Sequence, residues 1–329
     1  MRILWLTTDR SQRVAQLFDP LRRSVEKIAG VDTVFGGIWT RDDVRRGRTV
    51  APKLDPGQVN AEYDIAFTDA PFAFLGEDWE RITIPKCALI EDLHGQEVPK
   101  YVGACYERGF DTFFVRYWTA AYRHYPHLWE CDVRHLPHCV DTDIFHPYDA
   151  PKEGALFTGS MTGDAYPVRQ IIVSRCAGKP WFRRIPRPVE RDPGDREFTG
   201  AAYARALSGA AAAFATPSIY GYTVAKYFEI PACGTTLLCR PSPDMEALGF
   251  CSGTHYLELD LNDIPGRVEW ALEHPEMLGA IAAAGRHLIG NRHTTTIRAR
   301  ELVDHFADIA GTRPDRPREA AELQLLGNA

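Results

Sequence analysis

Short apolar runs alternate with segments of helical periodicity along most of this chain of 329 residues. In the first half, the runs that have the length and composition of buried strands are Arg2–Thr8, Val31–Phe35, Tyr63–Thr68, Cys87–Ile90 and Thr112–Val115. The segments between them that carry apolar residues every three or four positions are Val14–Gly30, Phe72–Arg81, Val98–Arg108 and Trp118–Tyr125. Strands that alternate with helices predict a parallel sheet covered by helices on both faces.

A second series of the same kind begins after a change of composition at Pro147. Tyr148–Glu153 reads as a polar linker, and Ala155–Thr158 reads as the first strand of the new series. The sequence therefore predicts an α/β fold with two Rossmann-like domains facing a central cleft, at residues 1–147 and 148–305, with a tail at residues 306–329. Open parallel sheets bind ligands beyond the carboxyl ends of their strands, so this cleft is the expected site.

The stretch Ser218–Arg240 carries the most informative local pattern. Its residues predict a turn at Tyr220–Gly221–Tyr222, a helix capped at its start by Thr223, and a buried strand after Gly234. A helix that begins here presents free backbone amides around Tyr222 and Thr223, and such amides bind anions.

Two charged residues extend that anion site along the same helix. Lys226 would add positive charge beside a phosphate, and Glu229 lies roughly 9 Å along the axis from Thr223. That spacing is about the distance from a diphosphate to the ribose hydroxyls of one nucleotide, so Glu229 could accept hydrogen bonds from ribose. A plain helix–strand unit with two solvated charges remains the alternative.

Composition narrows the class of protein. The net charge of −6 argues against a protein that lives on nucleic acid or on an anionic membrane, although nucleic acid stays open as an acceptor. Eight cysteines without a CxxC pair indicate reduced thiols. The N-terminal run is interrupted by Asp9 and Arg10, which favours a first strand over a signal peptide, and no apolar run approaches the length of a membrane span. A cytoplasmic location is expected.

Three motifs carry a resemblance to a known family. Leu136–Pro147 (LPHCVDTDIFHP) is similar to an interdomain hinge, Leu156–Arg169 (LFTGSMTGDAYPVR) to the opening of a donor domain, and Tyr227–Gly234 (YFEIPACG) to a donor-site motif. Together they resemble GT-B glycosyltransferases of the retaining family-four kind, closest to the spore-maturation-protein-like branch. The resemblance covers residues 136–305 well; over the first half it rests on the order of elements.

The resemblance implies a donor site on the second domain. Glu229 matches the glutamate that binds ribose, and Lys226 stands where relatives carry a cation. Gly159 and Ser160 match the turn where backbone approaches the diphosphate, and Arg169 matches a cation for the phosphates.

One position departs from the family pattern. The first glutamate of the family's Glu-x(7)-Glu motif, which touches the donor sugar, falls on Gly221. The departure leaves the sugar contact and the retaining mechanism open.

The candidates in the first half follow predicted strands and so lie on the rim of the cleft. Asp92 and His94 are the expected catalytic pair, since a histidine there could orient a hydroxyl or take its proton. Asp9 and Arg10 are the expected acceptor-side residues. For His94 the alternative is a structural histidine that hydrogen-bonds a nearby backbone carbonyl. For Asp9 and Arg10 the alternative is a solvated loop.

Two further clusters carry weaker signals. The spacing of Cys131, His135, His138 and Cys139 fits no common zinc site, so no metal is expected. The short basic run at Arg183, Arg184 and Arg187 is expected to edge the donor-base pocket or to face solvent, rather than to bind nucleic acid.

The sequence thus predicts a glycosyltransferase, a hexosyl- or pentosyltransferase, that moves a sugar from a nucleoside-diphosphate-sugar to a hydroxyl acceptor. The donor would be of the UDP or GDP type, and neither a cofactor nor a metal is expected. Two alternatives stay open, a nucleotide-sugar epimerase or hydrolase and a non-catalytic nucleotide-sugar-binding protein on the same fold.

Overall fold

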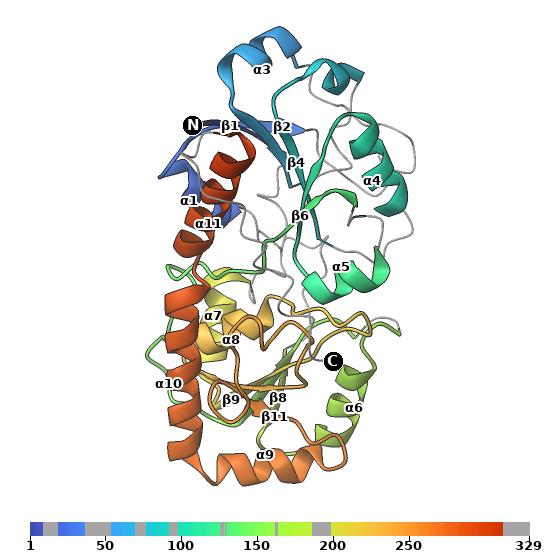
Figure 1. Ribbon diagram of the computed structural model, residues 1–329. Helices are drawn as coiled ribbons and strands as arrows, with labels where there is room; N and C mark the ends of the chain where they lie inside the picture. The colour runs from blue at the N-terminus through green and yellow to red at the C-terminus, as the bar shows by residue number, and fades with distance from the viewer. Residues whose placement is uncertain are drawn as a thin grey trace.

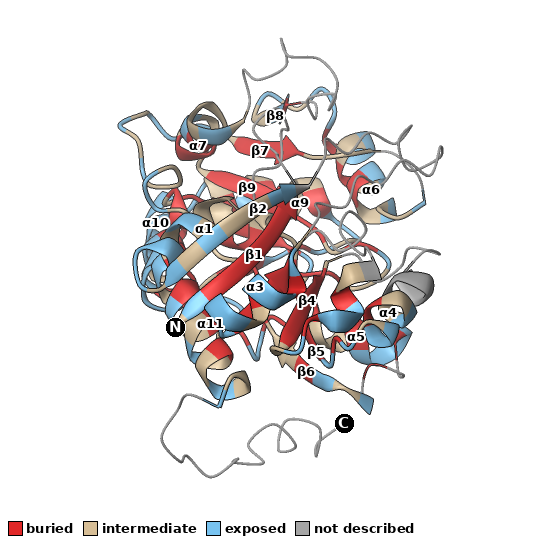
Figure 2. Ribbon diagram, turned by 90° about the horizontal axis from the view of Figure 1, so that it is seen from above, coloured by how far each residue is buried: buried red, intermediate tan, exposed pale blue. Residues whose placement is uncertain are grey.

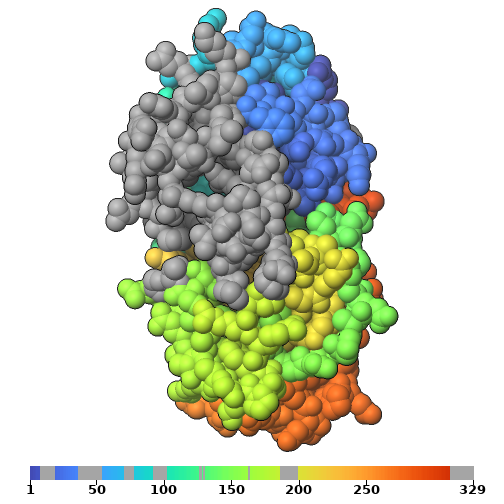
Figure 3. Space-filling model, turned by 180° about the vertical axis from the view of Figure 1, so that it is seen from behind, coloured from blue at the N-terminus to red at the C-terminus, as the bar shows by residue number. Residues whose placement is uncertain are grey.

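The computed structural model describes residues 1–8, 19–36, 54–69, 77–91, 98–125, 128, 130–161, 164–185 and 199–311. Within these ranges the chain forms two α/β units that lie end to end (Figure 1). Each unit has its own parallel sheet, and in Figure 3 the blue atoms of the first unit lie above the green and yellow atoms of the second.

The first unit is built on a six-stranded parallel sheet with the strand order β2-β1-β3-β4-β5-β6. Its strands are β1 (Arg2–Thr8), β2 (Gly30–Gly36), β3 (Ile65–Thr68), β4 (Lys86–Ile90), β5 (Thr112–Val115) and β6 (Asp132–His135). Its helical elements are α1 (Asp19–Glu26), α3 (Pro56–Glu62), the 3₁₀ helix η2 (Glu77–Arg81), α4 (Val98–Glu107) and α5 (Trp118–His124). Every residue of β3, β4 and β5 is buried, as expected for central strands covered on both faces (Figure 2).

The second unit is built on a five-stranded parallel sheet with the order β11-β10-β9-β7-β8. Its strands are β7 (Ala155–Thr158), β8 (Phe182–Ile185), β9 (Ala212–Ala215), β10 (Thr236–Cys239) and β11 (Leu257–Glu258). Its helices are α6 (Pro167–Cys176), α7 (Gly200–Ser208), α8 (Lys226–Ala232), α9 (Ile264–Leu272) and α10 (Pro275–Arg292). Two parallel sheets with helices on their faces agree with the α/β architecture expected from the sequence.

The last described helix, α11 (Thr295–Ile309), returns to the first unit. Leu302 and Phe306 are fully buried against residues of the first sheet, and the rings of Phe306 and Phe67 lie 5.2 Å apart. The sequence-based division placed residues up to 305 in the second unit, but the apolar face of α11 packs on the first (Figure 1). Helical periodicity predicts the helix; it does not identify the sheet that the helix covers.

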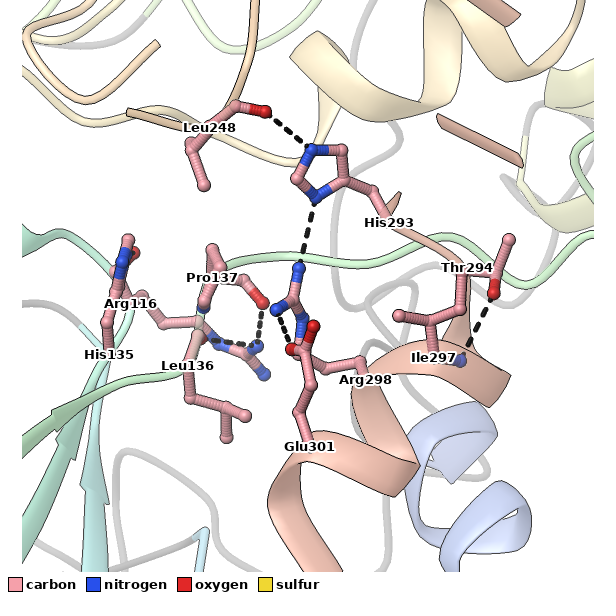
Figure 4. Close-up of polar contacts among 10 residues, drawn as sticks. All are labelled: Arg116, His135, Leu136, Pro137, Leu248, His293, Thr294, Ile297, Arg298 and Glu301. Atoms are coloured by element: carbon pink, nitrogen blue, oxygen red, sulfur yellow. Dashed lines mark hydrogen bonds and ion pairs between the residues drawn. The ribbon is translucent and has the colours of Figure 1, made fainter. Parts of the chain in front are cut away.

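Buried polar groups hold each of the two crossings between the units in place (Figure 4). The Arg116 guanidinium donates to the carbonyls of Leu136 and Pro137, both at 3.2 Å, at the start of the first crossing. In the second crossing, His293 accepts a hydrogen bond from Arg298 at Nδ1, 3.1 Å away, so its Nε2 donates to the carbonyl of Leu248. Burial lowers the pKa of His293 to about 4, which keeps this imidazole neutral at neutral pH.

Local differences from the sequence-based elements have physical reasons. α3 is absent from the elements expected above, and it forms because Asp55 caps the helix and Pro56 fits its first turn. β6 went unrecognised because its four residues, DVRH, lack an apolar run. Residues 243–249 form a series of turns between β10 and β11.

Candidate functional site

The best-defined candidate site lies at the carboxyl end of β7, which lies between β9 and β8 in the second sheet. Gly159 follows this strand with a φ of +126°, a conformation that favours glycine. A Cβ atom added to Gly159 would clash with the Lys226 ammonium and lie 3.2 Å from Nη1 of Arg169. Two cations from different helices therefore converge on a backbone turn that has no side chain of its own.

Arg169 is fixed by several contacts at the start of α6. It is 6% exposed, its Nε donates to the hydroxyl of Thr216 at 3.2 Å, and its Nη1 donates to the carbonyl of Ser160 at 3.1 Å. Its guanidinium also lies 3.5 Å from the centre of the Tyr166 ring. These contacts hold the positive charge at the edge of the sheet rather than in solvent.

Lys226 is the first residue of α8, and its ammonium donates to the carbonyl of Thr158 at the end of β7. The expected helix cap at Thr223 is wrong by two residues, because Ala225 occupies the cap position of α8 and makes no side-chain capping bond. The hydroxyl of Thr223 is buried and hydrogen-bonds Ser242 instead. The amides around Tyr222 and Thr223 therefore lie outside the first turn of α8.

Glu229 follows Lys226 by one helical turn on α8. Burial raises the pKa of its carboxyl to about 7, against an opposing effect of the Lys226 charge. None of the described residues donates a hydrogen bond to this carboxylate. A half-buried carboxylate of this kind can accept hydrogen bonds from a polar ligand.

Tyr203, on α7, is a polar neighbour that the sequence analysis missed. Its hydroxyl lies 3.2 Å from the hydroxyl of Thr158, and burial raises its pKa, with a further contribution from the Glu229 charge. The tyrosine stands alone in an alanine-rich helix, which was the only signal in the sequence.

Gly221 lies on the loop that leads to α8 and has a φ of +78°. A Cβ atom there would lie 3.3 Å from the ring of Pro243. A side chain at this position is disfavoured by both the backbone and the contact, so the site is built without a glutamate at position 221.

Five of the predicted donor residues are thus brought together, namely Gly159, Ser160, Arg169, Lys226 and Glu229. Tyr222 is 2% exposed and its side chain faces the first unit, where its ring stacks on Tyr117 at 4.0 Å.

The four predicted residues of the first unit, Asp9, Arg10, Asp92 and His94, lie outside the described residues. The described part of the same sheet edge includes a buried carboxylate that the sequence analysis missed. Asp69, directly after β3, accepts from Trp5 Nε1 at 2.9 Å and from the Thr7 hydroxyl at 2.7 Å.

The cysteine–histidine cluster engages protein groups instead of facing one centre. His138 Nε2 pairs with the Tyr117 hydroxyl at 3.1 Å, and His135 Nε2 donates to the Arg116 carbonyl at 3.2 Å. Within the described ranges, no group of three or more His, Cys, Asp or Glu side chains is arranged to hold a metal ion.

The basic run on β8 is partly engaged as well. Arg183 donates to the carbonyl of Ala206 at 2.9 Å, while Arg187 lies outside the described residues. None of the described helices combines the length and the apolar character that crossing a membrane requires.

Comparison with known proteins agrees with this arrangement. A family model described as glycosyl transferase-like matches residues 166–304, which include α6, α8 and the site residues Arg169, Lys226 and Glu229. A search of curated proteins finds no match.

Solved structures match over nearly the whole chain. Sucrose-phosphate synthase from Thermosynechococcus elongatus is 12% identical, with a TM-score of 0.68 over 95% of this chain and 100% of that one. The chain has the GT-B fold. Anabaena HepE in complex with UDP and glucose is 11% identical, with a TM-score of 0.64 over 93% of this chain and 99% of that one. AviGT4, a glycosyltransferase involved in avilamycin A biosynthesis, is 11% identical, with a TM-score of 0.57 over 95% of this chain and 99% of that one.

These likenesses confirm the predicted fold class, two Rossmann-like units in the GT-B architecture. Loops that follow strands of the two sheets meet between the units, since Tyr117, after β5, stacks on Tyr222, which follows β9. The more specific resemblance to the spore-maturation-protein-like branch stays a prediction.

Proposed function

We propose that this protein is a glycosyltransferase that uses a nucleoside-diphosphate-sugar as donor and a hydroxyl group as acceptor. The observation that carries the proposal is the joint placement of Gly159, Lys226, Arg169 and Glu229 at the end of β7. The match of the glycosyl transferase-like family model to residues 166–304 supports the same assignment. HepE, which shares the fold, has been solved with UDP and glucose and with UDP-glucose.

In the proposed complex, the donor diphosphate lies over Gly159, where the missing side chain leaves room for phosphate oxygens. Lys226 and Arg169 supply positive charge from two sides. Glu229 accepts hydrogen bonds from the ribose hydroxyls, and those bonds favour its ionised form.

The proposed reaction breaks the bond between the sugar C1 and the diphosphate oxygen and forms a bond between C1 and the acceptor oxygen. The acceptor hydroxyl loses its proton, and His94 or Asp92 is the proposed base or orienting group. Lys226 and Arg169 stabilise the charge that develops on the leaving diphosphate, so no metal is proposed. Retention of configuration is proposed from the resemblance to family-four enzymes alone.

Direct binding tests the donor site. Calorimetry with UDP and GDP should show that Glu229→Ala weakens the binding of the nucleoside diphosphate by about 1–3 kcal/mol, the usual loss for a hydrogen bond to a charged group. Glu258→Ala, at an exposed glutamate of β11 in the same unit, is the matched control and should bind as the wild type does. If Glu229→Ala binds both nucleotides like the control, the donor assignment is wrong.

One observation favours a second candidate, a protein that binds nucleotide sugars without transferring them. Gly221 stands where family members contact the donor sugar, and its backbone disfavours a side chain. Under this alternative, the wild type would still bind the donor and Glu229→Ala would still bind it more weakly. No acceptor would accelerate release of the nucleoside diphosphate.

A further inference from the structure

A cluster of side chains joins the two units next to the proposed donor site. It consists of Tyr117 and Thr119 from the first unit and Tyr222 and Asp244 from the second, and we call it the latch. None of these residues belongs to the hinge sequence at 136–147, and only Tyr222 was singled out by the sequence.

The first contact of the latch is a helix cap supplied across the domain interface. The residue before α5, Tyr117, makes no side-chain capping bond. Instead, Oδ1 of Asp244 accepts hydrogen bonds from the Thr119 backbone amide, at 2.9 Å, and from the Thr119 hydroxyl. Asp244 lies 125 residues away along the chain and is 3% exposed. The second unit thereby satisfies a backbone donor of the first.

The second contact is an aromatic stack beside the cap. The rings of Tyr117 and Tyr222 lie 4.0 Å apart with an interplanar angle of 7°, and both are almost fully buried. Tyr222 belongs to the hydrophobic cluster of the first unit, together with residues such as Val115 and Ala120, and Tyr220 and Val224 pack against that cluster. A segment of the second unit is therefore anchored in the core of the first.

The anchored segment leads directly to the donor helix. Val224 also packs against the second unit's own cluster, and α8 starts two residues later with Lys226. On the other side, Pro243 packs against Gly221, and Asp244 follows it. A separation of the units must therefore remove Tyr222 from the first-unit core and break the Asp244 cap, next to Lys226.

We infer that Asp244 is a positioning residue for glycosyl transfer, which acts through Thr119 and α5 to keep the two cleft edges in register. The inference rests on the proposed function. The nucleoside diphosphate contacts proposed above all lie in the second unit, whereas transfer needs groups from both units. Loss of the latch should therefore affect transfer much more than nucleotide binding.

The test compares substitutions of Asp244 that differ only in the cap. Asp244→Asn keeps an acceptor oxygen for the Thr119 amide and should retain transfer within a few-fold, whereas Asp244→Ala should lower single-turnover transfer ten-fold or more. UDP or GDP affinity should change less than two-fold in both. Glu246→Ala, at an exposed residue of the same segment, is the control for disturbance of the loop.

A second variant approaches the same bond from the other unit. Thr119→Val removes the hydroxyl and keeps the amide, so its loss of transfer should fall between those of the two Asp244 variants. Because both changes break one interaction, Thr119→Val should add little to Asp244→Ala in the double variant.

Hydrogen exchange gives a readout that does not depend on turnover. The Thr119 amide should exchange faster in Asp244→Ala and at the wild-type rate in Asp244→Asn. If the wild type transfers no sugar at all, the proposed function fails, and the exchange result still tests the latch.

Three results would overturn the inference. A wild-type rate of transfer in Asp244→Ala would mean that the cap is a structural contact with no part in transfer. Equal loss in Asp244→Asn and Asp244→Ala would mean that the charge itself acts, rather than the cap. Unchanged exchange at Thr119 in Asp244→Ala would show that the bond does not hold α5 in solution.

Discussion

Substitution of Glu229 by glutamine should stabilise the protein while weakening its nucleotide site. The carboxyl is half-buried on α8, and none of the described residues donates a hydrogen bond to it. Burial raises its pKa from the ordinary 4.5 to about 7. The ionised form of Glu229 is therefore less favourable in the folded protein than in the unfolded chain, so ionisation of this carboxyl lowers the free energy of unfolding. Glutamine has the same shape and carries no charge at any pH.

The size of the effect follows from the pKa. A change from 4.5 to about 7 corresponds to at most about 3 kcal/mol in the free energy of unfolding. The remaining solvent exposure of the side chain reduces this to about 1–2 kcal/mol. For a unit of this size, each kcal/mol moves the melting temperature by about 2–4 °C.

The sign of the pH dependence is fixed because the folded protein holds the Glu229 proton more tightly than the unfolded chain does. Wild-type stability should therefore fall relative to Glu229→Gln as the pH rises from about 4.5 through about 7, and the difference should stay constant above that. Thermal unfolding of both proteins from about pH 5 to about pH 8 measures it, with Glu258→Gln as the exposed control. Saturating UDP should raise the melting temperature of the wild type more than that of Glu229→Gln.

A difference between Glu229→Gln and wild type that does not change with pH would refute the reasoning. So would a variant that melts below the wild type above about pH 7. Either result would mean that the carboxylate already has a stabilising partner in the folded protein.

Three further predictions concern the proposed reaction. Lys226→Ala should weaken UDP or GDP binding about ten-fold or more but change nucleoside binding less than two-fold, because its proposed partner is the diphosphate; equal losses in calorimetry would count against that partner. Transfer should survive saturating EDTA, since Lys226 and Arg169 supply the positive charge; complete loss that manganese restores would contradict this. His94→Ala should lower the single-turnover rate on the order of 100-fold and leave donor affinity unchanged, and a wild-type rate would return His94 to a structural role.

The sequence was sufficient for elements whose signal is local. The buried runs of β4 and β5 and the helix α5 appear where expected, because apolar patterning alone decides them. The same holds for Gly234, whose φ of +66° ends the α8 segment in the left-handed conformation.

Features that depend on distant residues were not accessible from the sequence. Threonine is a common helix-capping residue, but the hydroxyl of Thr223 hydrogen-bonds Ser242, nineteen positions later. The cap of α5 is Asp244, whose partner lies in the other unit. No local pattern connects residues that only the folded chain brings together, so the latch could not be predicted.

The most direct test of the proposed function is turnover of a panel of UDP- and GDP-sugars, with released nucleoside diphosphate and glycosylated acceptor measured together. The wild type should release nucleoside diphosphate from at least one donor, faster with an acceptor than without, and Glu229→Ala should lose most of that rate at a low donor concentration. Binding of nucleoside diphosphate without acceptor-dependent release from any donor would contradict the assignment as a transferase and favour the binding protein instead.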